Sequence, residues 1–250
     1  MGKVIAIAIQ KGGNGKTTTT QNLGAGLVLK GYKVLLIDLD GQCSLSYSCG
    51  ADLGTEGIWE VLNNKVQAKE VIQHINGIDL IPASTSLACA DQQFQSEGKE
   101  YLLKKALEPL KRKYDYILID CPPSLNILTI NALTASNEVI IPCQADIYSL
   151  MGIGQLGNTI NAVKEHSNSK LKITGILLTR YNNRAVLNKK ITQMIEDATS
   201  QLGTKVFNAT IREGIAIKEA QAMQQDIFTY SKRSKVASDY MGLVEEVIQG

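Results

Sequence analysis

A short run of residues near the start of the chain combines flexible backbone, positive charge and hydroxyl groups. It lies between an apolar stretch, 4–9, and a helix-like stretch, 18–30, and it consists of Gln10-Lys11-Gly12-Gly13-Asn14-Gly15-Lys16-Thr17-Thr18. Glycines let backbone N–H groups crowd around phosphate oxygens, and the N-terminus of a following helix adds partial positive charge. In such a loop Lys16 would contact the β- and γ-phosphates, and the Thr17 hydroxyl would bind Mg²⁺. The run therefore predicts a nucleotide-phosphate site.

This loop departs from the usual phosphate-loop pattern, Gly-x-x-x-x-Gly-Lys-Ser/Thr, at two positions. Gln10 stands where the pattern has glycine, and Lys11 is an additional cation inside the loop. In a monomer Lys11 would only point to solvent, whereas in a face-to-face dimer it would reach the partner's nucleotide. A Gly-rich turn that binds nothing is the remaining alternative. The agreement of strand, loop, lysine, threonines and helix argues against it.

Two further apolar runs end in carboxylates. One ends in Asp38 and Asp40, which alternate along the chain and so can face the same side, and the other ends in Asp120. Ligands of open α/β sheets bind at the carboxyl ends of the strands. An apolar strand that ends in aspartate has the Walker-B form, and Asp120 would hold Mg²⁺ through water. For Asp38 and Asp40, a pair of solvated loop acids is the alternative.

The three segments together resemble a known family, the deviant Walker-A ATPases: the ParA/Soj partition proteins, MinD and the nitrogenase iron protein. Residues 11–18 resemble its phosphate loop, 38–42 its switch I motif Asp-x-Asp-Pro-Gln, and 116–124 its switch II motif, and the resemblance extends from Lys3 to Val247. It implies that Lys11 crosses a dimer interface, that Asp40 orients the attacking water, and that Asp38 helps to hold Mg²⁺. Gly41 stands where the family usually has proline, which predicts a less rigid loop.

Two late segments correspond to the nucleoside end of the family's site. The segment 177–184 contributes there to the adenine and ribose pocket, which makes Asn182 the candidate for a base or sugar contact, with a plain polar loop as the alternative. The segment 211–221 resembles the part beside the base. Arg212-Glu213-Gly214 and Ala216 replace residues that include basic family positions, so the family's DNA-contacting arginines do not all carry over.

The net charge of +2 gives no bulk electrostatic argument for nucleic acid, and the few aromatic residues argue against base stacking. Basic residues are nevertheless concentrated between Arg180 and Arg212. The candidate contacts with the DNA backbone are Arg184, Lys189, Lys190, Arg212 and Lys218. A solvated helix face is the alternative for this group, and for a second group at 232–235. A third group, at 104–113, is interpreted as the solvated face of an amphipathic helix.

Apolar runs alternate with helix-like segments along the chain. Strands are expected at 3–9, 33–38, 78–82, 114–120, 138–142 and 171–179, and helices at 18–30, 58–63, 98–113, 125–135, 149–166, 186–202 and 234–248. This alternation is typical of a mostly parallel twisted sheet with helices on both faces. We expect one α/β P-loop NTPase domain over residues 1–250, without an N-terminal helix-turn-helix domain.

Other features exclude classes of function. The five cysteines form no Cys-x-x-Cys and the chain has two histidines, which argues against a zinc site and suits a reducing cytoplasm. No apolar run approaches the ~20 residues of a membrane-spanning helix. The end of the chain, 245–250, is acidic and short, which disfavours a membrane-binding tail.

The leading functional prediction is an ATPase for the partition of DNA from a plasmid, mobile element or chromosome. It would use ATP and Mg²⁺ with slow intrinsic turnover, form a homodimer on ATP binding, and bind duplex DNA without sequence preference. A ParB-type centromere-binding protein would stimulate it, and it would be cytoplasmic and nucleoid-associated. The alternative is a MinD-like positioning ATPase that acts on a membrane or another cargo. A metabolic ATPase is a third class, which neither the cysteine pattern nor the length supports.

Overall fold

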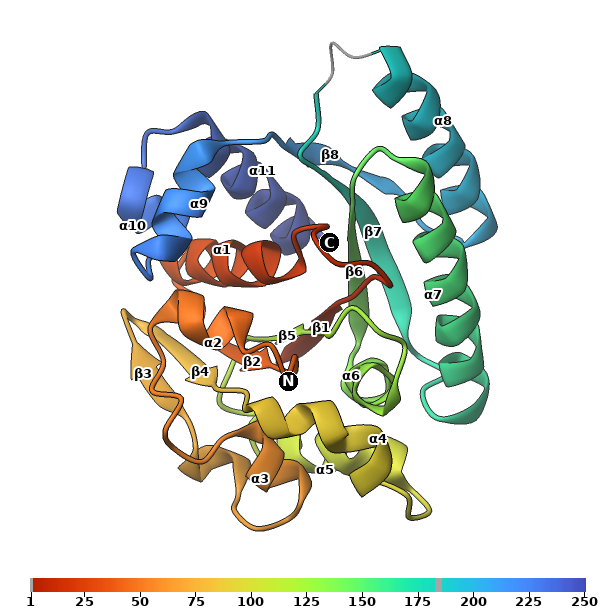
Figure 1. Ribbon diagram of the computed structural model, residues 1–250. Helices are drawn as coiled ribbons and strands as arrows, with labels where there is room; N and C mark the ends of the chain where they lie inside the picture. The colour runs from red at the N-terminus through yellow and green to blue at the C-terminus, as the bar shows by residue number, and fades with distance from the viewer. Residues whose placement is uncertain (1, 183–185) are drawn as a thin grey trace.

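The computed structural model describes residues 2–182 and 186–250, and a single eight-stranded sheet forms its centre (Figure 1). The strand order is β3-β4-β2-β5-β1-β6-β7-β8, with β3 antiparallel to β4 and every other neighbouring pair parallel. The strands are β1 Lys3–Ile7, β2 Val34–Asp38, β3 Gln73–Ile75, β4 Ile78–Ile81, β5 Tyr116–Asp120, β6 Glu138–Cys143, β7 Lys172–Thr179 and β8 Val206–Ile211.

Helices cover both faces of the sheet (Figure 1). They are α1 Lys16–Leu29, α2 Ser44–Cys49, α3 Ile58–Leu62, α4 Ala90–Gln93, α5 Leu102–Leu107, α6 Ile127–Ala135, α7 Ile147–His166, α8 Val186–Gln201, α9 Ile215–Ala222, α10 Ile227–Ser231 and α11 Lys235–Gln249, with 3₁₀ turns η1 Ala68–Glu70, η2 Thr85–Cys89 and η3 Lys99–Tyr101. Residues of α1, α2, α10 and α11 belong to one hydrophobic core, and residues of α3 to α8 belong to the other.

The central position of β1 explains why its sequence is apolar from Val4 to Ile7. Val4 and Ala6 belong to one core, while Ile5 and Ile7 belong to the other, and all four are fully buried. Because successive side chains of a strand point to opposite faces, a strand covered on both sides needs apolar residues at every position. The expected fold class, a mostly parallel sheet with helices on both faces, is confirmed.

The observed elements differ from the expected ones in identifiable places. The helix expected at 98–113 consists of η3 and a shorter α5 that ends at Leu107, so Lys111, Arg112 and Lys113 lie beyond it. Pro109 contributes to this early end, because it has no backbone N–H with which to continue the helical hydrogen bonds. Six helices and strands were not expected from the sequence, namely β3, β8, α2, α4, α9 and α10. Of these, β8 alternates apolar and polar residues at an edge of the sheet, which gives a weaker signal than a buried run.

Candidate nucleotide site

The loop between β1 and α1 has the backbone that an anion cradle requires. Gly13 and Gly15 have φ angles of +80° and +81°, in the left-handed region that side chains disfavour. A Cβ added at Gly12 or Gly13 would meet nothing within 4 Å, so the loop faces open space. Helix α1 begins at Lys16 without a side-chain cap from Gly15. The first N–H groups of α1 are therefore directed at whatever fills that space.

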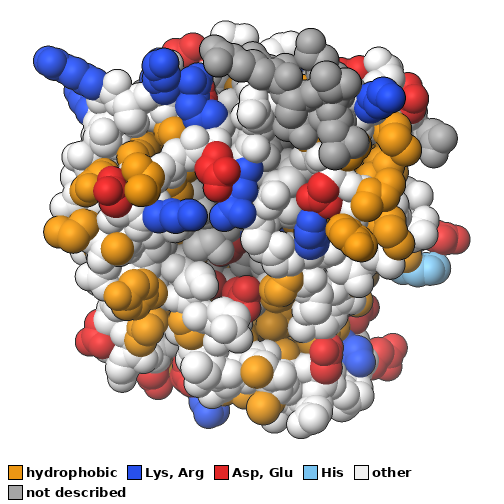
Figure 2. All heavy atoms as spheres, turned by 45° about the horizontal axis from the view of Figure 1, so that its top comes forward, with side chains coloured by type: hydrophobic (Ala, Val, Ile, Leu, Met, Phe, Trp, Pro, Cys, Tyr) orange, Lys and Arg blue, Asp and Glu red, His pale blue; other side chains and the backbone are white. Residues whose placement is uncertain are grey.

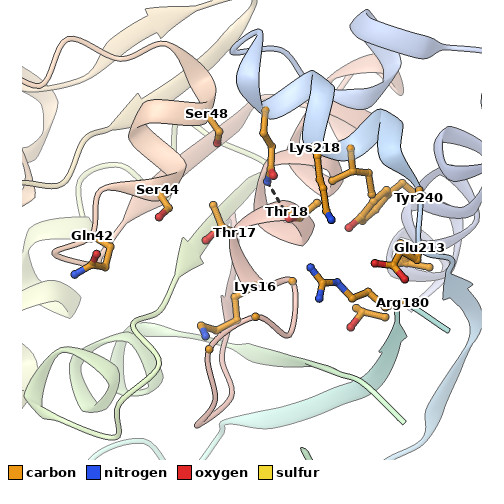
Figure 3. A pocket seen from close by; sticks show the side chains of 18 of the residues that line it. Lys16, Thr17, Thr18, Gln42, Ser44, Ser48, Arg180, Glu213, Lys218 and Tyr240 are labelled. Carbon is orange, nitrogen blue, oxygen red and sulfur yellow. Dashed lines mark hydrogen bonds between the residues drawn. The ribbon is translucent and has the colours of Figure 1, made fainter. Parts of the chain in front are cut away.

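This space is a cavity of about 690 Å³ at the carboxyl ends of the central strands, a volume typical of small-molecule sites. Its wall comes from the phosphate loop, the segment after β2 with Asp40 and Gln42, the end of β7 with Thr179 and Arg180, and the segment 211–222. Figure 2 shows basic and acidic side chains gathered on this side of the molecule. Figure 3 shows the lining side chains projecting from these elements into the cavity.

Lys16 and Asp120 are buried and interact electrostatically, and Lys16 lines the cavity. Lys16 is only 7% exposed, and its Nζ donates to the backbone oxygen of Lys11 at 3.0 Å. Burial lowers the pKa of Lys16, and the charge of Asp120 opposes this in part. Burial raises the pKa of Asp120 well above its usual range, assisted by the charge of Asp38. The Thr17 hydroxyl donates to Asp120 Oδ2 at 2.7 Å.

Asp38 and Asp40 have separate environments, although they are close in sequence. Asp38 is fully buried, and it accepts hydrogen bonds from Ser46 N at 2.8 Å, Ser46 Oγ at 2.7 Å and Asp40 N at 3.1 Å. Burial raises the pKa of Asp38 to about 6, even though these hydrogen bonds oppose the shift. Asp40 is half-buried and lines the cavity, and its Oδ1 accepts from Gln42 N at 3.0 Å.

The donor set at this point fits Mg²⁺ bound together with a nucleotide. Thr17 Oγ1 and Asp120 Oδ2 are adjacent oxygen ligands, and Asp38 pairs with Asp120 across β2 and β5. No group of three or more His, Cys, Asp and Glu side chains is arranged to hold a metal within the described part of the chain. Magnesium commonly takes one or two protein oxygens and completes its octahedron with phosphates and water, so these residues suffice.

Lys11 forms an ion pair within its own chain. Its Nζ lies 2.9 and 2.8 Å from the two carboxylate oxygens of Asp146 and 3.4 Å from Ser149 Oγ, and it lies over the ring of Tyr148. Burial alone would raise the pKa of Asp146, but the hydrogen bonds from Lys11 and Ser149 outweigh it and lower that pKa. The alternative that Lys11 merely points to solvent is therefore wrong for this structure. Its action across a dimer stays a prediction.

The start of α7 and the end of β7 hold the phosphate loop in place. Gln144 Nε2 donates to Gly13 O at 2.9 Å, Ser149 Oγ donates to Asn14 Oδ1 at 3.3 Å, and Thr179 Oγ1 donates to Asn14 O at 3.0 Å. Gln144, Asp146 and Ser149 were not predicted from the sequence. One signal was available for Asp146, because an aspartate before a long helical stretch is a typical N-cap, and it does accept from Ser149 N at 2.9 Å.

Some of the residues predicted to contact the nucleoside or DNA line the cavity, and others do not. Among the described residues, the cavity lining includes Arg180 but not Asn182, which is exposed. Arg212 and Lys218, predicted DNA contacts, also line the cavity, and Arg212 pairs with Asp239 at 2.7 and 2.8 Å. Lys190 is exposed on α8. Arg184 and the side chain of Lys189 lie outside the described residues.

Gly41 packs closely against a neighbouring element, although its place in the sequence predicted a less rigid loop. A Cβ at this position would lie 3.1 Å from the backbone nitrogen of Ala88 in η2. Because Gly41 has no side chain, the loop that carries Asp40 and Gln42 can pack directly against η2, which supports it. The close approach explains why a smaller residue stands where the family pattern has proline.

A glycine loop with Lys16 and Thr17 after a central parallel strand, and an aspartate at the end of the adjacent strand, define the class: the chain is an α/β P-loop NTPase. A family model described as an AAA domain matches residues 2–173. The chain is 41% identical to the sporulation initiation inhibitor protein Soj of Bacillus subtilis, over 99% of this chain and 98% of Soj. It is 37% identical to the chromosome partitioning protein ParA of Caulobacter vibrioides, over 98% and 94%.

Among solved structures, cobyrinic acid a,c-diamide synthase of Mycobacterium smegmatis with bound ATP analog and magnesium is similar, with a TM-score of 0.88 and 33% identity over 100% of this chain and 95% of that chain. The chain therefore belongs to the ParA/Soj family of deviant Walker-A P-loop ATPases. No helix in residues 2–182 and 186–250 combines the length and apolar character needed to span a membrane.

Proposed function

We propose that the protein is a ParA-type partition ATPase. It binds ATP with Mg²⁺, dimerises face to face, binds duplex DNA without sequence preference in the ATP state, and hydrolyses ATP slowly until a ParB-type partner stimulates it. The observation that carries this proposal is the pair of loop lysines: Lys16 is buried and lines the nucleotide cavity, and Lys11, one residue before the cavity-lining Gly12, is held by Asp146. Similarity to Soj and ParA over nearly the whole chain supports it.

The side chains around the cavity have distinct roles in hydrolysis. Backbone N–H groups of Gly12, Gly13 and Gly15, with Lys16, hold the β- and γ-phosphates, and Thr17 and Asp120 hold the metal. Mg²⁺, when bound, supplies neutralisation of the phosphate charge. Asp40 accepts a hydrogen bond from the attacking water and orients it toward the γ-phosphate, while the bond from Gln42 N keeps its carboxylate facing the cavity.

Dimerisation brings Lys11 to the partner's nucleotide and requires its ion pair with Asp146 to open. Next to this pair, α7 exposes three large apolar side chains at its start: Ile147 is 48% exposed, Tyr148 69% and Met151 59%. An apolar ridge of this kind beside charged groups is a typical protein contact surface. We assign it to a second copy of the chain, because it adjoins the lysine that the dimer model places at the interface.

A synthetase is the second candidate, and the 33% identity to the diamide synthase favours it. Such an enzyme would use ATP to activate a carboxylate, and its turnover would depend on an acid substrate rather than on DNA. The higher identity to Soj, 41%, favours the partition function. ATP turnover measured with and without duplex DNA separates the two candidates, because only a partition ATPase responds to DNA.

The test of the proposed function is a fluorescence anisotropy titration of random-sequence duplex DNA. Binding is expected with ATP and Mg²⁺ and not with ADP or without nucleotide, and it should fall steeply with salt because counterions are released from the phosphates. Lys190→Glu should weaken it, whereas Lys105→Glu, the same charge change at an exposed position of α5, should not. Equal binding in all three nucleotide conditions, or none with ATP at low salt, would overturn the proposal.

A further inference from the structure

Arg180 is a cation of the nucleotide cavity, although its sequence position groups it with a basic surface. It immediately follows β7 and lines the cavity together with Lys16 and Lys218. Figure 3 shows its guanidinium projecting into the cavity toward Thr18, while Lys218 projects toward the same region from α9. Although Arg180 is exposed, a basic side chain with this direction can contact a ligand in the cavity.

The backbone at Arg180 is held in an unfavourable conformation from both sides. Its φ angle is +48°, in the left-handed region that a residue with a side chain rarely adopts. Thr179 before it donates to Asn14 O at 3.0 Å and to Cys143 O at 3.1 Å, and Tyr181 N after it donates to Ile211 O at 2.9 Å. These bonds fix the chain reversal that turns the arginine inward. Strained residues of this kind cluster at ligand sites, where surrounding contacts impose them.

The charges around the cavity leave Arg180 available for an anion. Four basic residues line it, namely Lys16, Arg180, Arg212 and Lys218, against Asp40 and Glu213. Arg212 is engaged by Asp239, whereas neither Arg180 nor Lys218 forms an ion pair with any described residue. A guanidinium has a fork of donors that suits phosphate oxygens, and its interaction with them is strengthened by charge.

We propose that Arg180 binds the α-phosphate of the nucleotide within its own chain. Gln42 and Ser44, on the side of Asp40 where hydrolysis takes place, lie on one side of the start of α1, and Arg180 lies on the other (Figure 3). The guanidinium is thereby placed toward the nucleoside end of the triphosphate. Because ATP and ADP share the α-phosphate, this contact contributes equally to the binding of both nucleotides. The proposed contact of Lys11 differs, because it depends on the γ-phosphate. The inference rests on the proposed binding of ATP in this cavity.

The test compares nucleotide affinities of the full chain by calorimetry with Mg²⁺. Arg180→Gln should weaken ATP and ADP by a similar factor, on the order of tenfold to a hundredfold for one charge-assisted bond, and should leave adenosine binding unchanged. Arg112→Gln, an exposed arginine before β5 at the opposite end of the sheet, is the matched control and should bind as the wild type does. Arg180→Gly removes the unfavourable φ angle, so its unfolding temperature without nucleotide should equal or exceed the wild-type value while its ADP affinity falls.

Unchanged ATP and ADP affinities in Arg180→Gln would overturn the inference while leaving the proposed function intact. A loss confined to ATP would contradict the α-phosphate assignment, and an equal loss for adenosine would show stacking on the base instead. A wild-type protein that binds neither nucleotide would overturn the proposed function itself, and this inference with it. A fall in unfolding temperature for Arg180→Gly together with unchanged ADP affinity would show that Arg180 serves the fold alone.

Discussion

Lys11 pairs with Asp146 of its own chain, and in the proposed dimer the nucleotide of the second copy would compete for it. In the structure it pairs with Asp146, and both side chains remain about a third exposed. An ion pair in contact with water contributes on the order of 1 kcal/mol or less, so a triphosphate with several negative charges can displace it. The pair therefore restrains Lys11 without locking it. Its opening leaves the cap of α7 in place, because Asp146 accepts from Ser149 N independently of Lys11.

Asp146→Asn should make ATP-dependent dimerisation occur at lower protein or ATP concentration, by a few-fold, because Lys11 loses its charged partner. Asparagine is as good an N-cap as aspartate, so α7 should keep its start. The measurement is a light-scattering titration with ATP. Glu138→Gln is the matched control, since it removes the partner of Lys3 at the other end of β6. A dimer that forms less readily in Asp146→Asn than in Glu138→Gln would contradict the restraint.

Asp38 makes stability without nucleotide depend on pH. Its pKa in the folded protein is raised from 3.8 to about 6, so the folded state holds this proton more tightly than the unfolded state. Stability from such a group is complete below the unfolded pKa and is lost as pH rises through the folded one. Between pH 5 and 7.5 the free energy of unfolding should fall by about 1 kcal/mol from Asp38. Urea denaturation at these pH values should show it, and Asp38→Ala should reduce the fall while the contribution of Asp120, whose pKa is also raised, remains; a rise in stability over this interval in the wild type would contradict the shift.

At the scale of elements, the site depends on loops that pack closely against neighbouring helices and turns. The loop that carries Asp40 lies against η2 at Gly41, and α7 lies against the phosphate loop at Gly152, where a Cβ would be 3.1 Å from Gln10 O. In both places the short distance is to a backbone atom, which has little freedom to move. Glycine is therefore needed at both positions for this close packing. Through each contact, the position of one element determines where a functional side chain on the other element lies.

Gly41→Ala should displace Asp40 and slow ATP hydrolysis several-fold, while ATP affinity stays near the wild-type value. The added methyl group would meet Ala88 N at 3.1 Å, so the loop has to shift, yet the phosphate loop itself is untouched. Single-turnover hydrolysis and calorimetry measure the two quantities. Gly242→Ala on α11, where a Cβ makes an ordinary contact, is the control. Wild-type hydrolysis by Gly41→Ala would show that this packing does not position Asp40.

Local sequence patterns predicted those parts of the site that depend on neighbouring residues. The glycine loop, Lys16, Thr17 and the two strand-end aspartates could be found because their chemistry and their strand and helix signals occur together in the chain. Asp146 and Arg180 could not be found in this way, because their roles arise from strands brought together by the sheet order. The segment around Asn182 illustrates the limit: this segment does reach the cavity, but through Thr179 and Arg180, and the φ angle of Arg180 decides which side chain enters it.

At the scale of the whole molecule, the sheet order brings the candidate functional residues together at the carboxyl ends of the central strands. β1 lies between β5 and β6, so the phosphate loop, Asp120 and the start of α7 meet at adjacent strand ends. Lys11 and the apolar ridge of α7 lie next to the cavity on this side of the molecule. The candidate nucleotide site and the surface proposed to contact a second copy are thereby adjacent, which is the arrangement that ATP-controlled dimerisation would require.

The central claim is that Lys11 couples ATP to dimerisation, and light scattering of three proteins tests it most directly. With ATP and Mg²⁺, Asp40→Ala should bind nucleotide without hydrolysing it and should have twice the monomer mass, whereas with ADP it should stay monomeric. Adding Lys11→Ala to Asp40→Ala should return the protein to monomer, because the partner's phosphates lose their cation. Adding Lys105→Ala instead should leave the dimer intact. A dimer that survives Lys11→Ala, or that forms equally with ADP, would contradict this coupling.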